Sequence, residues 1–284
     1  MPTESAQLHV HDPEHGDLVF GAVVAGAEEG EPVLLLHGWP QTALSWSRVI
    51  GPLAAGGLRV AAVDQRGYSE GARPADVAAY TTSRLVSDAA DLLEALGWGT
   101  AHIVGHDWGA IVGWELAARH PGLVRSLTAL SVPHPRAFIH AIRTDPAQRE
   151  KSAYMQFFRS EPAVAATVLT REHAAALRQV YGDAVHHHDV EAYVDFFSHG
   201  DAMEASLRWY AAMDDEGLAS TPEVTVPTTF VWGSDDIAIG ATAAHGCAQW
   251  CTGDYDFREL TGRGHWLPDQ DPDAVVDAIL ARVG

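Results

Sequence analysis

The chain has 284 residues, of which 47% are hydrophobic, enough for one large domain with a buried core. No apolar run reaches the about 18–20 residues of a membrane-spanning helix, and the amino-terminal stretch lacks the basic-then-apolar layout of a signal peptide. Because 18 basic and 38 acidic residues give a formal charge of −20, we expect neither nucleic acid nor a membrane surface as a partner.

The chain has only two cysteines, Cys247 and Cys251, too few for a disulfide framework, so we expect a reducing, cytoplasmic location. Their C-x-x-x-C spacing lacks a partner motif of His or Cys. The cluster His186–His188 is typical of a solvated loop. We therefore expect no metal and no cofactor.

Apolar runs bounded by turn residues alternate with helix-like stretches in the first half of the chain. The runs expected to be strands are Val19–Ala25, Val33–His37, Arg59–Asp64, Ala101–His106 and Val124–Val132. The stretches expected to be helices are Thr42–Ala55, Tyr80–Leu96 and Ala110–His120. This alternation predicts an α/β fold with a mostly parallel sheet covered by helices on both faces.

The pattern changes between residues 133 and 217, where no convincing strand occurs. Helices are expected there at His140–Asp145, Glu161–Leu169, Glu172–Tyr181 and Val190–Met213. The α/β alternation then resumes with a strand, a helix, a strand and a last helix, at Pro227–Trp232, Ala241–Trp250, Tyr255–Leu260 and from about Asp271. We interpret residues 133–217 as a helical cap inserted into a core domain made of residues 1–132 and 218–284.

The sequence Gly105-His106-Asp107-Trp108-Gly109 lies between a predicted strand and a predicted helix. Small residues on both sides of a central residue allow a sharp turn that holds the central side chain above the sheet edge. We predict that Asp107 is a nucleophile at this turn. The structural alternative is that Asp107 only caps the following helix.

A carboxylate nucleophile favours displacement at an sp³ carbon. A serine attacking an epoxide or alkyl halide would form an ether, which water does not cleave at a useful rate. A carboxylate forms an ester instead, and water can hydrolyse that ester at its carbonyl carbon.

Two later motifs supply partners for Asp107 in the chain order nucleophile, acid, histidine. His265 follows the last predicted strand, and we expect it to activate the water that attacks the ester. Asp236, in the turn Gly233–Asp236, is expected to orient this histidine, with the neighbouring Asp235 as the competing candidate.

The loop His37–Pro40 follows another predicted strand and allows a cis bond before Pro40. We expect the backbone N–H groups of Trp39 and Trp108 to form an oxyanion hole for the tetrahedral intermediate of ester hydrolysis.

The chain resembles the α/β-hydrolase-fold epoxide hydrolases, on the aspartate-nucleophile branch, along nearly its whole length. The resemblance is carried by HGWPQ (His37–Gln41), DQRGYS (Asp64–Ser69), GHDWGA (Gly105–Ala110), WGSDD (Trp232–Asp236) and GRGHW (Gly262–Trp266). The same branch contains haloalkane and haloacetate dehalogenases, so the leaving group must be considered separately.

The resemblance implies two cap tyrosines that donate to the oxirane oxygen. Tyr154, in Tyr-x-x-aromatic-aromatic, and Tyr210, in a Trp-Tyr pair, match the family's positions. A phenol stays protonated at neutral pH and can donate a proton as the alkoxide develops.

Dehalogenases of the branch need other residues. Haloalkane dehalogenases hold the halide with Trp plus Asn or with two Trp; this chain contains no Asn, which leaves a Trp pair such as Trp108 with Trp209. Haloacetate dehalogenases carry Arg directly after the nucleophile, where this chain has Trp108.

We therefore predict an epoxide hydrolase that converts an apolar epoxide to a vicinal diol. Its expected partners are that small epoxide and water, and a homodimer is left open. The residues expected to contact substrate are His37, Phe157 and Phe197, and further apolar cap residues are Phe138, Met155 and Phe196. The alternatives are a haloalkane dehalogenase with the same machinery, an esterase, and a non-catalytic binding protein on this scaffold.

Overall fold

The computed structural model describes residues 3–284 and contains a sheet of eight strands in the order β1-β2-β4-β3-β5-β6-β7-β8. The strands are β1 (Glu4–Asp12), β2 (Gly16–Ala25), β3 (Glu31–Leu36), β4 (Leu58–Val63), β5 (Ala101–His106), β6 (Val124–Leu130), β7 (Thr228–Gly233) and β8 (Tyr255–Leu260). From β4 to β8 along this order all neighbours pair in parallel, whereas β2 pairs antiparallel with both β1 and β4. The expected mostly parallel sheet is confirmed.

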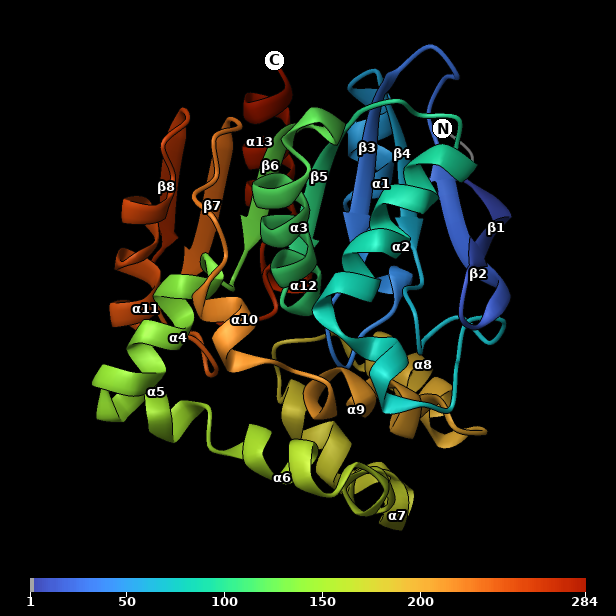
Figure 1. Ribbon diagram of the computed structural model, residues 1–284, viewed down its shortest axis with the longest axis vertical. Helices are drawn as coiled ribbons and strands as arrows, with labels where there is room; N and C mark the ends of the chain where they lie inside the picture. Colours follow the sequence, from blue (N-terminus) through green and yellow to red (C-terminus); the bar gives the residue numbers. More distant parts are fainter. Residues whose placement is uncertain (1–2) are drawn as a thin grey trace.

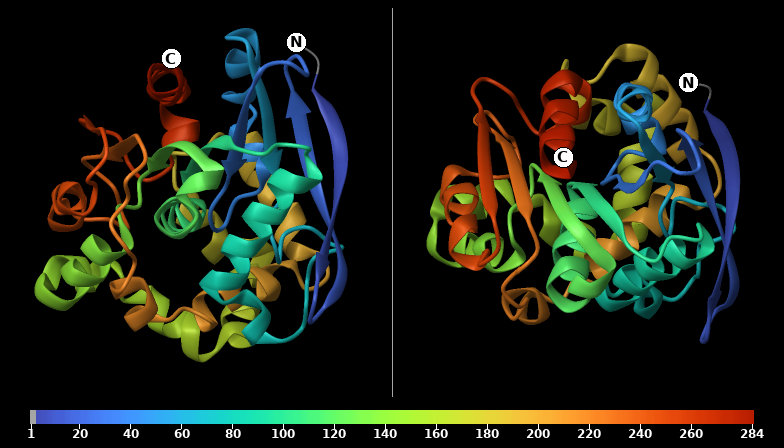
Figure 2. Two further views of the ribbon diagram at one scale, coloured as in Figure 1. Left: turned by 45° about the horizontal axis from the view of Figure 1, so that its top comes forward. Right: turned by 90° about the horizontal axis from the view of Figure 1, so that it is seen from above.

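Helices cover both faces of the sheet (Figures 1 and 2). On one face lie α1 (Ile50–Ala55) and α13 (Pro272–Val283), and on the other lie α2 (Thr82–Ala95) and α3 (Trp108–Arg119). Strand β3 is therefore buried on both sides. Val33 and Leu35 belong to the buried cluster that contains α1 and α13, whereas Leu34 and Leu36 belong to the buried cluster that contains α2 and α3. Successive side chains of a strand point to opposite faces, so a strand covered on both sides is apolar throughout.

Seven helices are inserted between β6 and β7 and lie together beyond one end of the sheet, at the bottom of Figure 1. They are α4 (Pro135–Thr144), α5 (Pro146–Lys151), α6 (Tyr154–Ser160), α7 (Pro162–Tyr181), α8 (His187–Ser198), α9 (Ala202–Ala211) and α10 (Asp215–Ala219). The two helices predicted within 161–181 correspond to the two parts of α7, which a non-helical stretch at Arg171–Ala174 separates. We propose residues 133–217 as the cap.

The structure differs from the sequence-based prediction where elements are short or end at a turn. Strand β1 was missed because it is an edge strand with polar residues on its solvent face; Leu8, Val10 and Asp12 are the side chains it buries. The single helix expected at 190–213 is two, since Gly200 adopts a φ of 58° between α8 and α9. Two further predicted helices are each divided into a short α-helix and a 3₁₀ turn, namely Thr42–Ala55 and Ala241–Trp250, the latter into α11 (Ala241–His245) and Cys247–Trp250. The short helices α5, α6, α10 and α12 (Leu267–Gln270) were not predicted.

Residues 3–284 contain neither a membrane-spanning helix nor a metal-binding cluster. No helix in this part of the chain is long and apolar enough to cross a lipid bilayer. Over the same residues, no group of three or more His, Cys, Asp or Glu side chains is arranged to hold a metal ion.

Candidate active site

Asp107 lies at the tip of the turn between β5 and α3. Its φ of 53° and ψ of −119° form a backbone conformation that residues with a side chain rarely adopt. The turn closes because its flanking residues are glycines: a Cβ on Gly105 would lie 2.2 Å from the carbonyl oxygen of Gly109. The strained turn predicted from the sequence pattern is therefore present.

The Asp107 carboxylate is held by backbone donors from two loops. The Trp39 N–H donates to Oδ1 at 2.7 Å, and the Trp108 N–H is a further donor to this carboxylate. The loop after β3 approaches so closely that a Cβ on Gly38 would lie 2.3 Å from Asp107 Cβ. A capping side chain accepts from the N–H of the second or third residue of its helix, and Asp107 makes no such bond to α3, so the structure does not support the helix-cap alternative.

His265 connects Asp107 with a second carboxylate. Its Nδ1 lies 3.0 and 2.9 Å from the two carboxylate oxygens of Asp236, and its Nε2 lies 3.4 Å from Oδ2 of Asp107. Asp236 is 1% exposed and also accepts hydrogen bonds from the N–H groups of Ala238 and Ile239. The structure thus brings Asp236 to the histidine, whereas the side chain of Asp235 is exposed and bonds to Ser234.

The charges of these groups depend on one another. Burial raises the pKa of Asp107, but the hydrogen bond and charge of His265 outweigh it and keep that pKa below its ordinary value. Burial lowers the pKa of His265, but the carboxylates of Asp236 and Asp107 raise it to about 10. In the free protein Asp107 and His265 therefore form a buried ion pair.

A cavity of about 230 Å³ lies beside Asp107, between the sheet and the inserted helices. Its lining residues are Trp39, Asp107, Lys151, Tyr154, Phe158, Gln179, Val180, Tyr210, Ile237, Ala238, His265 and Trp266. A smaller, mostly apolar hollow also borders Asp107 and both tyrosines, and it is lined further by Trp108, Ile111, Val132, Phe138, Met155, Met213, Ala238 and Ile239. The site therefore has two arms that meet at the carboxylate.

Tyr154 and Tyr210 reach this cavity from α6 and α9. Their ring centroids are 6.1 Å apart, and the Tyr210 ring packs edge-on against Trp39 and Trp108. Burial and the charge of Asp107 raise the pKa of both phenols, and each also feels the other tyrosine. Both hydroxyls are therefore protonated at neutral pH and available as donors.

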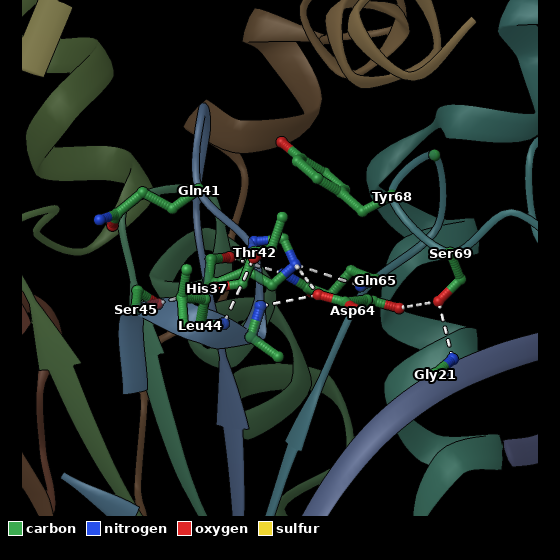
Figure 3. A network of polar contacts seen from close by, with 12 residues as sticks. Gly21, His37, Gln41, Thr42, Leu44, Ser45, Asp64, Gln65, Tyr68 and Ser69 are labelled. Carbon is green, nitrogen blue, oxygen red and sulfur yellow. Dashed lines mark hydrogen bonds and ion pairs between the residues drawn. The ribbon is translucent and has the colours of Figure 1, made fainter. Parts of the chain in front are cut away.

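The three residues expected to contact substrate do not line either arm. His37 is fully buried and belongs to the polar network of Figure 3: its Nε2 accepts from the Gln65 N–H, and its backbone carbonyl accepts from the Gln65 side chain. Phe197 is 1% exposed and packs edge-on against Tyr68. Phe157 lies on the exposed side of α6. These expectations are corrected.

The sequence contained a signal for Phe158, a cap phenylalanine that does line the cavity but was not predicted to. Residues four positions apart lie on the same face of a helix, so Phe158 shares a face with Tyr154. Its ring centroid lies 5.3 Å from that of Tyr154 and 4.9 Å from that of Trp39. The polar lining residues Lys151 and Gln179 carried no comparable signal, because their approach depends on how the inserted helices pack.

The alternative halide site, formed by Trp108 and Trp209, is incomplete in the structure. The indole N–H of Trp209, which was one of the two expected donors, binds the backbone carbonyl of Arg66 at 2.8 Å. Trp209 is therefore not available as the second donor of the expected Trp pair, whereas the indole N–H of Trp39, which lines the cavity, has no hydrogen-bond partner among residues 3–284.

Comparisons with known proteins agree with the fold. The family model described as the alpha/beta hydrolase fold matches residues 31–272. The chain is 30% identical to epoxide hydrolase 4 of Mus musculus over 99% of this chain and 80% of that protein. It is 31% identical to an AB hydrolase superfamily protein of Bacillus subtilis, over 93% of each. The structure of epoxide hydrolase A from Mycobacterium thermoresistibile superposes with a TM-score of 0.85 at 27% identity, over 99% of this chain and 98% of that one.

Proposed function

The chain belongs to the α/β-hydrolase fold family, within its epoxide hydrolases, and we propose that it opens epoxides by way of a covalent ester on Asp107. The observation that carries this proposal is that one carboxylate lies beside a backbone N–H donor, a histidine and two tyrosine hydroxyls. Asp107 meets the Trp39 N–H at 2.7 Å and His265 Nε2 at 3.4 Å, and it shares its cavity with Tyr154 and Tyr210.

In the first step, a carboxylate oxygen of Asp107 attacks one oxirane carbon and the ring C–O bond breaks. The electron pair of that bond stays on oxygen, which takes a proton from the hydroxyl of Tyr154 or Tyr210. The phenol then recovers a proton from solvent. This step gives a hydroxyalkyl ester of Asp107 and needs no base, because the carboxylate is already charged.

In the second step, His265 takes a proton from water as the water oxygen attacks the ester carbonyl. The negative charge of the tetrahedral intermediate develops on an oxygen of Asp107, beside the backbone donors of Trp39 and Trp108. Collapse breaks the bond between the carbonyl carbon and the alkoxide oxygen, which takes a proton and leaves as the diol. The buried carboxylate of Asp236 stabilises the imidazolium formed in between.

The shape of the site favours an apolar substrate. The smaller arm is lined mostly by aliphatic, sulfur and aromatic side chains, so it accommodates an apolar substituent of the oxirane. The two phenols supply the proton that an alkoxide needs. A halide needs N–H donors instead, and the Trp209 N–H is already bonded.

Isotope transfer tests the covalent mechanism. In a single turnover with excess enzyme in ¹⁸O-water, the new diol oxygen should come unlabelled from Asp107, and label should enter that carboxylate. The variant His265→Gln should accumulate the ester, visible as a mass increase equal to the substrate. Solvent oxygen in the first diol would instead show a direct attack by water. Turnover of aryl esters that survives Asp107→Ala would favour an esterase.

A further inference from the structure

The loop that carries the triad acid is fastened by side chains of the inserted helices. The loop Asp236–Gly240 follows β7, and helix α5 packs beside it. The Gln148 amide nitrogen donates to the carbonyl of Ala238 at 2.7 Å, and its amide oxygen accepts from the N–H of Gly240 at 2.7 Å. The Lys151 ammonium donates to the carbonyl of Asp236 at 2.6 Å.

Other polar groups of this loop are held from within the core. The N–H groups of Ala238 and Ile239 donate to the Asp236 carboxylate, and the carbonyl of Ile239 accepts from the indole of Trp232. The loop therefore has two sets of partners: the core orients the carboxylate, and α5 fixes the backbone that bears it. The core partners alone leave the carbonyls of residues 236 and 238 and the N–H of residue 240 without a bond.

The surroundings of Gln148 fit a role in holding this loop, because its side chain is shielded from solvent. Its side chain is fully buried, and it uses both ends of the amide, with a third bond to Ser152 at 3.0 Å. A buried amide with all its groups paired is rigid, and removal of its partners leaves polar groups unsatisfied. Ala238 also lines both arms of the cavity, so the same loop shapes the site.

We propose that Gln148 is a positioning residue for the hydrolytic step, acting through Asp236 on His265. The inference rests on the proposed function, because Asp236 and His265 act after the Asp107 ester has formed. Loss of the Gln148 bonds lets the loop move and loosens the orientation of the histidine. The attack of Asp107 on the epoxide uses neither residue as a base, so the first step should suffer less.

The test compares Gln148→Met, which keeps the side-chain length and removes the hydrogen bonds, with the matched control Gln156→Met. Gln156 is an exposed residue of α6 that makes no side-chain hydrogen bond among residues 3–284. Ester formation and ester hydrolysis are followed separately by acid quench and protein mass in single turnovers. We expect Gln148→Met to slow ester hydrolysis by roughly tenfold to a hundredfold, part of the about 10²–10⁴-fold that general base catalysis supplies. The ester should accumulate, while ester formation changes by less than about threefold.

A second readout separates positioning from loss of structure. With Asp236 held less closely, the pH at which ester hydrolysis is half-maximal should fall, because that carboxylate raises the pKa of His265. Lys151→Met removes the remaining α5 bond to the loop and should act in the same direction, which keeps the idea testable if Gln148→Met fails to fold. Equal losses in both steps with an unchanged pH profile would overturn the inference. If wild-type enzyme forms no ester at all, the proposed function itself has failed.

Discussion

Formation of the ester should change the protonation of His265, and the variant Asp107→Asn tests this directly. An Asn side chain has the shape of the carboxylate without its charge, as the esterified Asp107 does. In the free protein the pKa of His265 is raised to about 10, and two of the causes are the hydrogen bond and the charge of Asp107. Removal of that charge should therefore lower the pKa of His265.

The magnitude follows from the distance. Oδ2 of Asp107 lies 3.4 Å from Nε2 of His265, and two unit charges at that distance with an effective dielectric constant of about 20 interact by about 5 kcal/mol. Since about 1.4 kcal/mol corresponds to one pH unit, the pKa of His265 should fall from about 10 to between about 6 and 7. A base with such a pKa is well matched to work near neutral pH.

The assay is an NMR titration of the His265 ring in wild type and in Asp107→Asn. The variant Asp235→Asn serves as control, because Asp235 is exposed and is not bonded to His265. The control should titrate as wild type does. If His265 titrates within about one pH unit of its wild-type value in Asp107→Asn, the ion pair does not set its protonation, and the reasoning is refuted.

Three further predictions concern the donors, the triad acid and stability. Tyr154→Phe combined with Tyr210→Phe should reduce epoxide opening by about 10²–10⁴-fold, measured as the rate of ester formation; wild-type rates would exclude the phenols as proton donors. Asp236→Asn should slow ester hydrolysis by at least about tenfold whereas Asp235→Asn should not, and equal effects in single-turnover assays would contradict the choice of triad acid. Because the pKa of His265 is higher in the folded protein than in the unfolded chain, its contribution to stability is complete below pH about 6.5 and is lost as the pH rises to about 10. The free energy of unfolding from urea titrations should therefore fall over this window, and less so in Asp107→Asn; parallel curves would be inconsistent with the pairing.

The parts of the site that local sequence determines could be predicted. The turn at Asp107 needs a small residue two positions before it and another two positions after it. Gly105 and Gly109 therefore predict the turn. The strands β5 and β8 were placed at their observed bounds, since buried runs between turn residues leave little choice. These features depend on contacts between residues close in the chain.

The parts of the site that depend on packing between distant segments could not be predicted from the sequence. The sequence favoured Asp236 as the triad acid but left Asp235 as a competitor, and the structure separates them because the Asp235 N–H binds the carbonyl of Arg263, while Asp236 turns inward to His265. His37, the first residue of a loop of the site, was expected to contact substrate. Its ring instead turns toward Gln65, a contact across two strands that no local pattern encodes.

The placement of the indoles bears on which leaving group the site can serve. Burial raises the pKa of Tyr210, and a hydrogen bond from the Trp108 side chain acts in the opposite direction, so it favours the phenolate that remains after proton donation. Trp209, next to it in the chain, directs its N–H away to the carbonyl of Arg66. One indole thus assists the tyrosine and the other is engaged in the core. Trp108 already lines the smaller arm, but Trp209 would have to turn to the cavity to hold a halide, and the Arg66 carbonyl would then lose its bond in a buried place. The same sheet and the same Asp107 could support either reaction, and the two tyrosine hydroxyls beside Asp107 favour the epoxide, whose oxygen needs a proton.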